Sequence, residues 1–436
     1  MGQVADLHDQ PLPQPLRRMP LNRANRNGWR RLRLWRLQPL LLTSLVALAG
    51  CHPRNDAEGR GRVELSAGVP VGAVLSLSGN ANAYGQDQKL GLTLAQEAIN
   101  AAGGIAGSPV QLQLEDGGSD EAGASAAMSL QIQRGVLAVI GPTLSQQAFA
   151  ADPIAQRHGV PVVAPSNTAK GIPQIGWFIS RVSAQSSRIA PLSIAMALQL
   201  QPGLRRPAVF YSQDDAYSTA ETTIFQQALV AKGLKPITVQ RTNVTDTDFQ
   251  NQITDTLQLQ PDLIVISALP MDGGNLVRQI RELGYKGSLV VGNGMNSPNI
   301  YPICQRYCDG MLIAQAYSPE AASPINRRFL ELYRQLRGGA VPPQFSAQAF
   351  TAYQVVVEAL QKLQAAQPPG KPLTTLPLAE LRRRLNQTLL AGTYQTPLGE
   401  IRFTGDGEVI QKQFYVAQVK MNPAGSSGRF VLLPSP

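Results

Sequence analysis

The chain has 436 residues, of which 43% are hydrophobic and only 16% are charged, and its formal net charge is +10. This length exceeds one ordinary hydrophobic core and suits two α/β domains. Eight Arg and two Asp in residues 1–50 account for +6 of the net charge. The basic residues of the rest of the chain are spread along it, with no run longer than the three Arg at 382–384. Nucleic-acid binding needs basic residues clustered on one face, so this class of function is excluded.

The N-terminus carries the pattern of an export signal. Basic residues precede the eleven-residue apolar run Leu40–Gly50, which is too short to span a bilayer but fits a signal peptide. The run ends in Leu-Ala-Gly before Cys51, which resembles a bacterial lipobox. We therefore predict a signal peptide with a basic extension over 1–50, a lipid anchor on Cys51 and a flexible polar tether over 51–68. A core helix with an incidental Cys is the alternative, but it leaves the coincidence of these signals unexplained.

After the tether, short apolar strands alternate with amphipathic helices. A first set has expected strands at 71–77, 110–114, 136–140 and 160–164 and helices at 85–102, 121–134 and 145–158. A second set has expected strands at 177–181, 208–211, 236–240, 263–267 and 288–291 and helices at 189–200, 216–232, 249–257 and 273–283. Three helices at 324–336, 346–365 and 378–389, two strands at 399–403 and 413–419, and an irregular tail over 420–436 complete the expectation.

This alternation predicts an α/β fold with two parallel, doubly wound sheets. Two such sheets place a ligand between the carboxyl ends of their facing strands.

Several motifs in the first half resemble one known family in combination. They are VGAVLSLSG at 71–79, Tyr84-Gly85, NAAGGI at 100–105 and VIGP at 139–142. Their sequences and spacings are similar to those of the type I periplasmic binding proteins that serve ABC importers for branched-chain amino acids and amides. Each motif alone is weak, and the resemblance extends over residues 69 to 419, nearly the whole chain after the tether.

The resemblance implies two lobes joined by three crossovers, with lobe 1 at 69–184 plus 318–403 and lobe 2 at 185–317 plus 404–419. It implies a binding protein that captures an amino acid or related solute and delivers it to an ABC permease, and not an enzyme. A lipid-anchored, extracytoplasmic monomer without cofactor or metal is expected. The alternative is a ligand-sensing or cell-envelope regulatory lipoprotein that uses the same fold.

The residues themselves also argue against an enzyme. No H-E-x-x-H, Walker or G-x-S-x-G motif is present in the chain. His52 and His158 are the only His residues after Cys51, so a Ser-His-Asp hydrolase would have very few candidates for its base.

The family's ligand contacts map onto five residues of this sequence. Ser145, Ser166 and Thr168 fall on positions that hold the ligand carboxylate, and Tyr84 and Tyr217 fall on the aromatic positions of the two lobes. Ser145 opens a predicted helix, where its hydroxyl and the free N–H groups suit an anion. Helix capping explains Ser145 equally well on local grounds, a turn hydroxyl explains Thr168, and half-buried packing explains the tyrosines.

The amine side of the family's site differs in this sequence. Amino-acid binders of the family hold the ammonium with an acidic residue after a second-lobe strand, whereas this strand leads into Gly292–Met295, which has no carboxylate. A second acidic position of the family falls near Ser186. Asp272 is the nearest acidic candidate, although N-capping of a helix is the alternative for it, and Asp214 and Asp215 could also approach the cleft. We therefore expect a solute with a carboxylate or amide group and no requirement for a free α-amine.

Cys304 and Cys308 form a C-x-x-x-C pair. Zinc would need two further ligands, and the chain has few His residues to supply them. Export favours a disulfide over two free thiols, provided that the two Cα atoms lie within about 7 Å.

Overall fold

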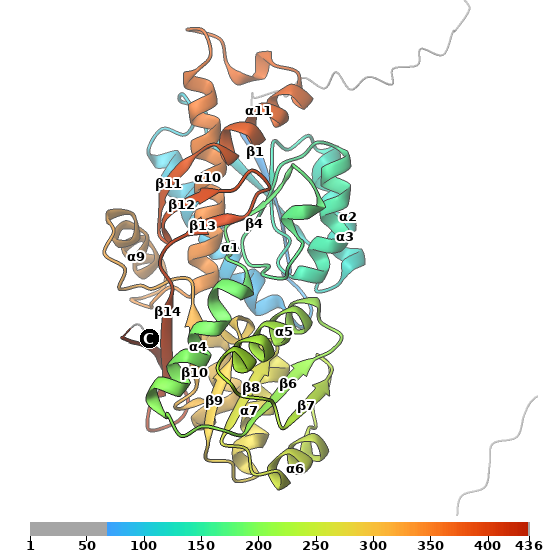
Figure 1. The fold of residues 1–436 in the computed structure, drawn as a ribbon. Helices are drawn as coiled ribbons and strands as arrows, with labels where there is room; N and C mark the ends of the chain where they lie inside the picture. Colours follow the sequence, from blue (N-terminus) through green and yellow to red (C-terminus); the bar gives the residue numbers. More distant parts are fainter. Residues whose placement is uncertain (1–67, 435–436) are drawn as a thin grey trace, which may run out of the picture. The chain divides into compact units, whose positions relative to one another are not determined.

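A computed structural model describes residues 68–434 (Figure 1). Contacts divide the chain into residues 1–57 and a compact unit of residues 58–436. The predicted signal peptide, the anchor at Cys51 and the tether up to residue 67 lie outside the described residues and stay predictions. None of the described helices combines the length and the apolar character that a membrane span needs.

The first sheet consists of five parallel strands in the order β2-β1-β3-β4-β5. Its strands are β1 (Val69–Leu75), β2 (Val110–Asp116), β3 (Val139–Ile140), β4 (Val162–Ala164) and β5 (Ile179–Arg181). All seven residues of β1 are buried, as expected for a parallel strand that helices cover on both faces. The helices connecting its first four strands are α1 (Asn82–Ala101), α2 (Glu121–Gln133) and α3 (Ser145–Arg157), and the short η2 (Pro173–Ile175) precedes β5.

Helices from the C-terminal third complete the body around the first sheet, which we call lobe 1. They are α9 (Pro324–Leu336), α10 (Gln344–Ala365), η6 (Leu373–Thr375) and α11 (Leu378–Leu390). Helix α10, drawn in orange beside α1 in Figure 1, is mostly buried and packs closely on α1. The close approach depends on Gly91, where a Cβ atom would lie 2.1 Å from the Ser346 carbonyl oxygen.

The second sheet forms the body that we call lobe 2. Its order is β15-β14-β10-β9-β8-β6-β7, and the five strands from β10 to β7 are parallel. These parallel strands are β6 (Pro207–Ser212), β7 (Thr238–Thr242), β8 (Leu263–Ser267), β9 (Ser288–Val291) and β10 (Leu312–Gln315). The helices are α4 (Ser186–Leu200), α5 (Ala216–Ala231), α6 (Gln250–Gln258), α7 (Pro270–Glu282) and α8 (Tyr301–Cys304), with short turns η3 (Asn293–Met295), η4 (Pro298–Ile300) and η5 (Gln305–Cys308).

The expectation of an irregular tail over 420–436 is wrong. Strand β14 (Tyr415–Met421) pairs antiparallel with β10, and β15 (Gly428–Leu433) pairs antiparallel with β14, so the second sheet is mixed. The turn between them is closed by Asn422, whose side-chain oxygen accepts from the backbone N–H of Ser426 at 3.0 Å. The Gly, Ser and Pro residues that suggested irregularity are concentrated in this turn and at the chain end, and the apolar run after Gly428 forms the edge strand.

The expected lobe boundary at residue 404 also differs from the pairing. Strands β11 (Thr393–Thr396), β12 (Gly399–Phe403) and β13 (Val409–Gln411) form a small antiparallel sheet. An ion pair of 2.5 Å between Arg181 and Glu408 ties its last turn to β5 of lobe 1. The chain thus crosses between the lobes three times, as expected. The first two crossings, at 182–185 and 316–323, include the expected boundaries, whereas the third lies at 412–414 instead of 403–404.

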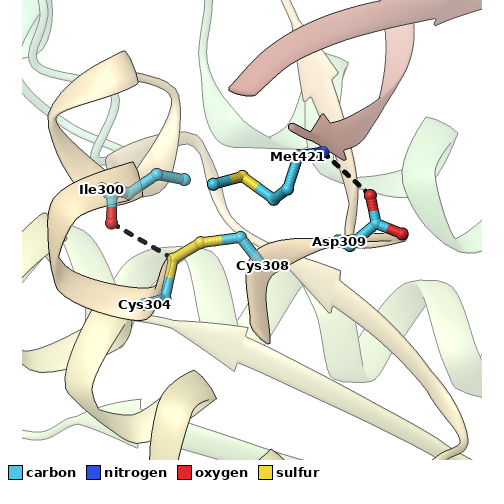
Figure 2. Close-up of a disulfide and its surroundings, with 5 residues drawn as sticks. All are labelled: Ile300, Cys304, Cys308, Asp309 and Met421. Carbon is cyan, nitrogen blue, oxygen red and sulfur yellow. Dashed lines mark hydrogen bonds between the residues drawn. A yellow bond between two sulfur atoms is a disulfide. The ribbon is translucent and has the colours of Figure 1, made fainter. Parts of the chain in front are cut away.

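Cys304 and Cys308 are joined by a disulfide, with their Cα atoms 5.5 Å apart (Figure 2). Both side chains are fully buried. The next residue, Asp309, accepts a 2.9 Å hydrogen bond from the backbone N–H of Met421. A hydrogen bond therefore joins the disulfide turn to the end of β14. This turn is the last part of the segment that connects β9 to β10.

Candidate functional site

In both lobes, the carboxyl ends of the parallel strands face the space between the lobes. Both sheets have their first five strands in the order 2-1-3-4-5 of the doubly wound fold, so each has a switch point where the chain leaves two adjacent strands in opposite directions. These points lie at the ends of β1 and β3 in lobe 1 and of β6 and β8 in lobe 2. Ligands of open α/β sheets bind at such points, outside the carboxyl ends of the strands.

A cavity of about 30 Å³ lies between the switch points of the two sheets. Lobe 1 contributes Tyr84, Thr143, Leu144, Ser145, Ser166, Asn167 and Phe345, and lobe 2 contributes Tyr217, Leu269, Asn293 and Gly294. The volume holds little more than a water molecule, whereas small-molecule pockets usually measure 300 Å³ or more, as an order of magnitude. The described cavity is therefore too small for an amino acid, and a solute of that size would need a wider separation of the lobes.

The lobe 1 wall of the cavity is rich in hydroxyl groups. Ser166 donates to the Thr143 carbonyl at 2.6 Å and accepts from Gln88 at 2.7 Å. The Thr143 hydroxyl donates to the other end of the same Gln88 amide at 2.6 Å. Sequence reasoning missed Gln88, a fully buried residue of α1 that fixes two cavity hydroxyls at once.

Ser145 is the first residue of α3. The N-cap residue Leu144 has no side-chain acceptor for the first turn, and the Gln147 side chain accepts from the Leu144 N–H at 3.0 Å. The Ser145 hydroxyl accepts only a long 3.4 Å hydrogen bond, from the Ala169 N–H. The hydroxyl and the uncapped N–H groups of the first turn are therefore available to a negatively charged or carbonyl oxygen in the cavity.

Thr168 does not line this cavity, unlike the other two predicted hydroxyl residues. Its side chain is buried, and its hydroxyl accepts from Ser186 at 3.2 Å. It borders a second hollow of about 470 Å³, lined also by Lys170, Gln185 and Ser186 among others. Its predicted contact with a carboxylate stays a prediction.

The lobe 2 wall is organised around Tyr217 and Glu221, one turn apart on α5. The Tyr217 hydroxyl donates to the Glu221 carboxylate and accepts from the Gly294 N–H at 2.5 Å. Glu221 also accepts from the Asn293 N–H at 3.0 Å. A carboxyl group thus lies beside the turn that was expected to lack one, but it comes from a helix instead of the strand end. The spacing of four residues between Tyr217 and Glu221 on one helix was the sequence signal that could have placed them side by side.

Glycine at position 292 leaves room for this arrangement. A Cβ atom there would lie 1.7 Å from a carboxylate oxygen of Glu221. The Glu221 carboxylate thus occupies the space that a side chain at position 292 would fill.

Helix α1 connects the two lobes around the cavity. The Tyr84 hydroxyl donates to the Gly294 carbonyl, and its ring packs edge-on against Phe345 with centroids 4.7 Å apart. Asp87, one turn further along, accepts from Ser297 at 3.2 Å and from Asn299 at 3.4 Å. Burial raises the pKa of Asp87 to about 7, even though the Ser297 hydrogen bond opposes the shift.

Asp272 does not line the cavity either. It lies buried in the first turn of α7, where Leu269 and not Asp272 is the N-cap. It accepts from the Ser212 hydroxyl, at the end of β6, at 2.5 Å. Burial raises the pKa of Asp272 and of Glu221 to about 7, and it raises the pKa of Asp215 as well.

No group of three or more His, Cys, Asp or Glu side chains among residues 68–434 is arranged to hold a metal ion. The described residues at the cleft offer hydrogen bonds, apolar contacts and buried carboxyl groups.

The family model for the periplasmic binding protein matches residues 68–428. The chain belongs to the periplasmic binding protein family. A Leu/Ile/Val-binding protein of Rhizobium johnstonii is 25% identical over 313 residues, which cover 71% of this chain and 83% of that protein. The members of the family are binding proteins and not enzymes, and they act outside the cytoplasm.

Solved structures agree with the fold of this periplasmic binding protein. A leucine binding protein of Thermotoga maritima aligns with a TM-score of 0.72 and 26% identity, covering 83% of this chain and 97% of that one. A solute binding protein of an ABC transporter from R. palustris, solved in complex with benzoate, aligns with a TM-score of 0.72 at 18% identity, covering 85% and 97%. The second likeness concerns the fold alone. The two-lobed architecture predicted from sequence is thereby confirmed.

Proposed function

We propose that this periplasmic binding protein captures a small solute with a carboxylate or amide group, an amino acid or a related acid, and delivers it to an ABC importer. The observation that carries the proposal is the cavity between the two switch points. Its lobe 1 wall offers the hydroxyls of Thr143, Ser145 and Ser166 and the uncapped start of α3, which suit the oxygen atoms of such a group.

The remaining wall suits a compact, largely apolar body. Tyr84, Phe345 and Tyr217 present aromatic rings, and Leu144 and Leu269 add aliphatic surface. Aromatic and aliphatic walls with a few placed polar groups are typical of small-molecule sites. The names of the similar proteins, which refer to leucine and to benzoate, are consistent with this class of solute.

Delivery to a permease would follow from opening and closing of the lobes. The three crossings act as the hinge, and the contacts of Tyr84, Asp87 and Gln344 across the cleft form only in the closed state. Anchoring through Cys51 would keep the loaded protein near the membrane complex, and a monomer is sufficient for this role. No observation favours the alternative of a sensing or regulatory lipoprotein.

Thermal shift on residues 58–436, freed of copurified solute by unfolding and refolding, tests the proposal. Amino acids, their amides and short carboxylates are screened singly. At least one should raise the melting temperature in a concentration-dependent way, because a ligand that binds only the folded state stabilises it. If none does so while the protein refolds to a cooperative melt, the proposed capture of such solutes is wrong.

A further inference from the structure

The first crossing between the lobes begins directly after a buried charged residue. Arg181 is the last residue of β5, and its side chain is fully buried. Its Nε and one terminal nitrogen donate to the Glu408 carboxylate at 3.1 and 2.5 Å. Of the ion pairs among residues 68–434, this is the one with a fully buried side chain. A buried guanidinium without its counter-charge is costly, so Arg181 constrains the position of Glu408.

The same guanidinium holds the loop at residues 166–169, which follows β4 and which we call the cavity loop. Its other terminal nitrogen donates to the carbonyls of Asn167 at 3.2 Å and of Ala169 at 2.7 Å. The Ser183 hydroxyl, in the first crossing, donates to the same Asn167 carbonyl at 2.6 Å. Asn167 and its neighbour Ser166 line the cavity. Arg181 therefore also fixes part of the lobe 1 wall of the cavity.

Glu408 connects two of the three crossings. It lies in the turn between β12 and β13, shortly before the third crossing at 412–414. The carboxylate oxygen that accepts from Arg181 at 2.5 Å also accepts from the Gln185 side chain at 2.7 Å. Gln185 ends the first crossing and is the N-cap of α4, the first helix of lobe 2. A single carboxylate thus joins the last strand of the first sheet to the first helix of lobe 2.

The start of α4 also binds the cavity loop directly. The Ser186 backbone N–H donates to the Thr168 carbonyl at 3.3 Å, and the Ser186 hydroxyl donates to the Thr168 hydroxyl at 3.2 Å. Both side chains are buried. Like the Gln185 bond, these bonds link lobe 2 to groups of lobe 1 that Arg181 holds in place. Rotation of the lobes about the first crossing would therefore stretch them.

We propose that Arg181 is a positioning residue for the movement of the lobes. It holds the Glu408 carboxylate and the cavity loop in the places where Gln185 and Ser186 bond to them, and these bonds favour the described arrangement of the lobes over more open ones. One side chain thereby couples the lobe 1 wall of the cavity to the relative position of the lobes. The inference concerns the solute-free protein and does not depend on which solute binds.

The distance between the lobes tests this role. Spin labels on Ala122→Cys in α2 and Thr254→Cys in α6, both exposed positions, report the separation by double electron–electron resonance in residues 58–436 freed of solute. Gln185→Ala removes the bond to Glu408 without leaving a charge buried. It should raise the ratio of longer to shorter separations by at least about threefold, because the lost bond to a charged group stabilises one arrangement only. Equal distributions in the parent and the variant overturn the inference.

Gln174→Ala is the matched control. The Gln174 side chain donates to Asp406 at 2.8 Å, and this bond joins η2 of lobe 1 to the same turn without involving a crossing or the cavity loop. The control should leave the separations unchanged. An equal shift in Gln174→Ala and Gln185→Ala would mean that the turn needs only general support, and it would also overturn the inference.

Arg181→Lys tests the positioning residue itself. A lysine keeps the charge, but its ammonium cannot replace the fork that binds Glu408 and two carbonyls at once. The variant should shift the separations in the same direction as Gln185→Ala, and unchanged separations would contradict the role of Arg181. If Arg181→Lys does not melt cooperatively, the comparison of Gln185→Ala with its control decides alone.

Discussion

At the scale of single residues, the Ser145 hydroxyl offers the cleanest probe of the lobe 1 wall. It lines the cavity and has only a long hydrogen bond within the protein. Ser145→Ala should therefore weaken solute binding by about 1–2 kcal/mol, roughly 5- to 30-fold, with little change in melting temperature. Titration calorimetry measures the affinity, and Ser129→Ala on α2 provides the same chemical change away from the cleft. An unchanged affinity would show that the Ser145 hydroxyl does not contribute to solute binding.

Gly292 tests the lobe 2 wall at the same scale. A methyl group there would overlap the Glu221 carboxylate, so Gly292→Ala should lower the free energy of unfolding by about 1–3 kcal/mol. Gly203→Ala is the matched control, because nothing lies within 4 Å of a Cβ atom there. Chemical denaturation measures both. Adding Glu221→Ala to the first variant should recover part of the loss, and full additivity of the two changes would contradict the proposed overlap.

The sequence predicted some of the cavity residues and missed others for a physical reason. Four predicted residues line the cavity: Tyr84, Ser145, Ser166 and Tyr217. They were predictable because they belong to motifs at strand ends and helix starts, whose place in a doubly wound sheet is fixed. Gln88 and Glu221 lie within helices, and the bonds that give them a role reach 78 and 72 residues along the chain. No local pattern reports such partners, and local patterns also cannot say that Thr168 and Asp272 stop short of the cavity.

At the scale of elements, the first two turns of α1 act as a bridge between the lobes. Asp87 contacts Ser297 and Asn299 across the cleft. Asp87→Ala should reduce the population of the closed state and weaken affinity by about 3- to 10-fold, mainly through faster dissociation. Stopped-flow measurement of solute release checks this, and Glu97→Ala on the exposed face of α1 is the control. A slower association with unchanged dissociation would contradict the bridging role.

Whether a segment forms a helix or a strand was easier to predict from the sequence than which strand it pairs with. The strand expected at 288–291 coincides with β9, because continuous apolar runs bounded by polar turns specify a buried parallel strand. Neither of the edge strands β13 and β15 was expected, and the residues of β13 were assigned to lobe 2. Short strands at a sheet edge have little burial pattern of their own and depend on the neighbour that pairs with them.

At the scale of the whole molecule, the buried acids make stability depend on pH. Burial raises the pKa of Glu221 from 4.5, and of Asp87 and Asp272 from 3.8, to about 7. Between those values the folded protein binds more protons than the unfolded chain. The stabilisation is complete below pH 4, approximately, and is lost as the pH rises through about 7.

The melting temperature of solute-free residues 58–436 should therefore fall by at least about 3 °C between pH 5 and pH 8. Scanning calorimetry in buffers of matched ionic strength measures the change. The double variant Glu221→Gln, Asp272→Asn should show a shallower slope. A melting temperature that rises over this interval would mean that other groups dominate and that the three acids are not held in the protonated form.

The three crossings between the lobes also determine how early during synthesis each lobe can fold. Lobe 1 takes α10, α11 and its small sheet from residues 344–411, and the second sheet takes its last two strands from residues 415–433. Contiguous domains fold one after another as the ribosome releases them. Here lobe 1 lacks its small sheet until residue 411 has been made, and lobe 2 lacks its last strand until residue 433 has been made. Such late closure would keep the new chain unfolded and fit for passage through a translocation channel.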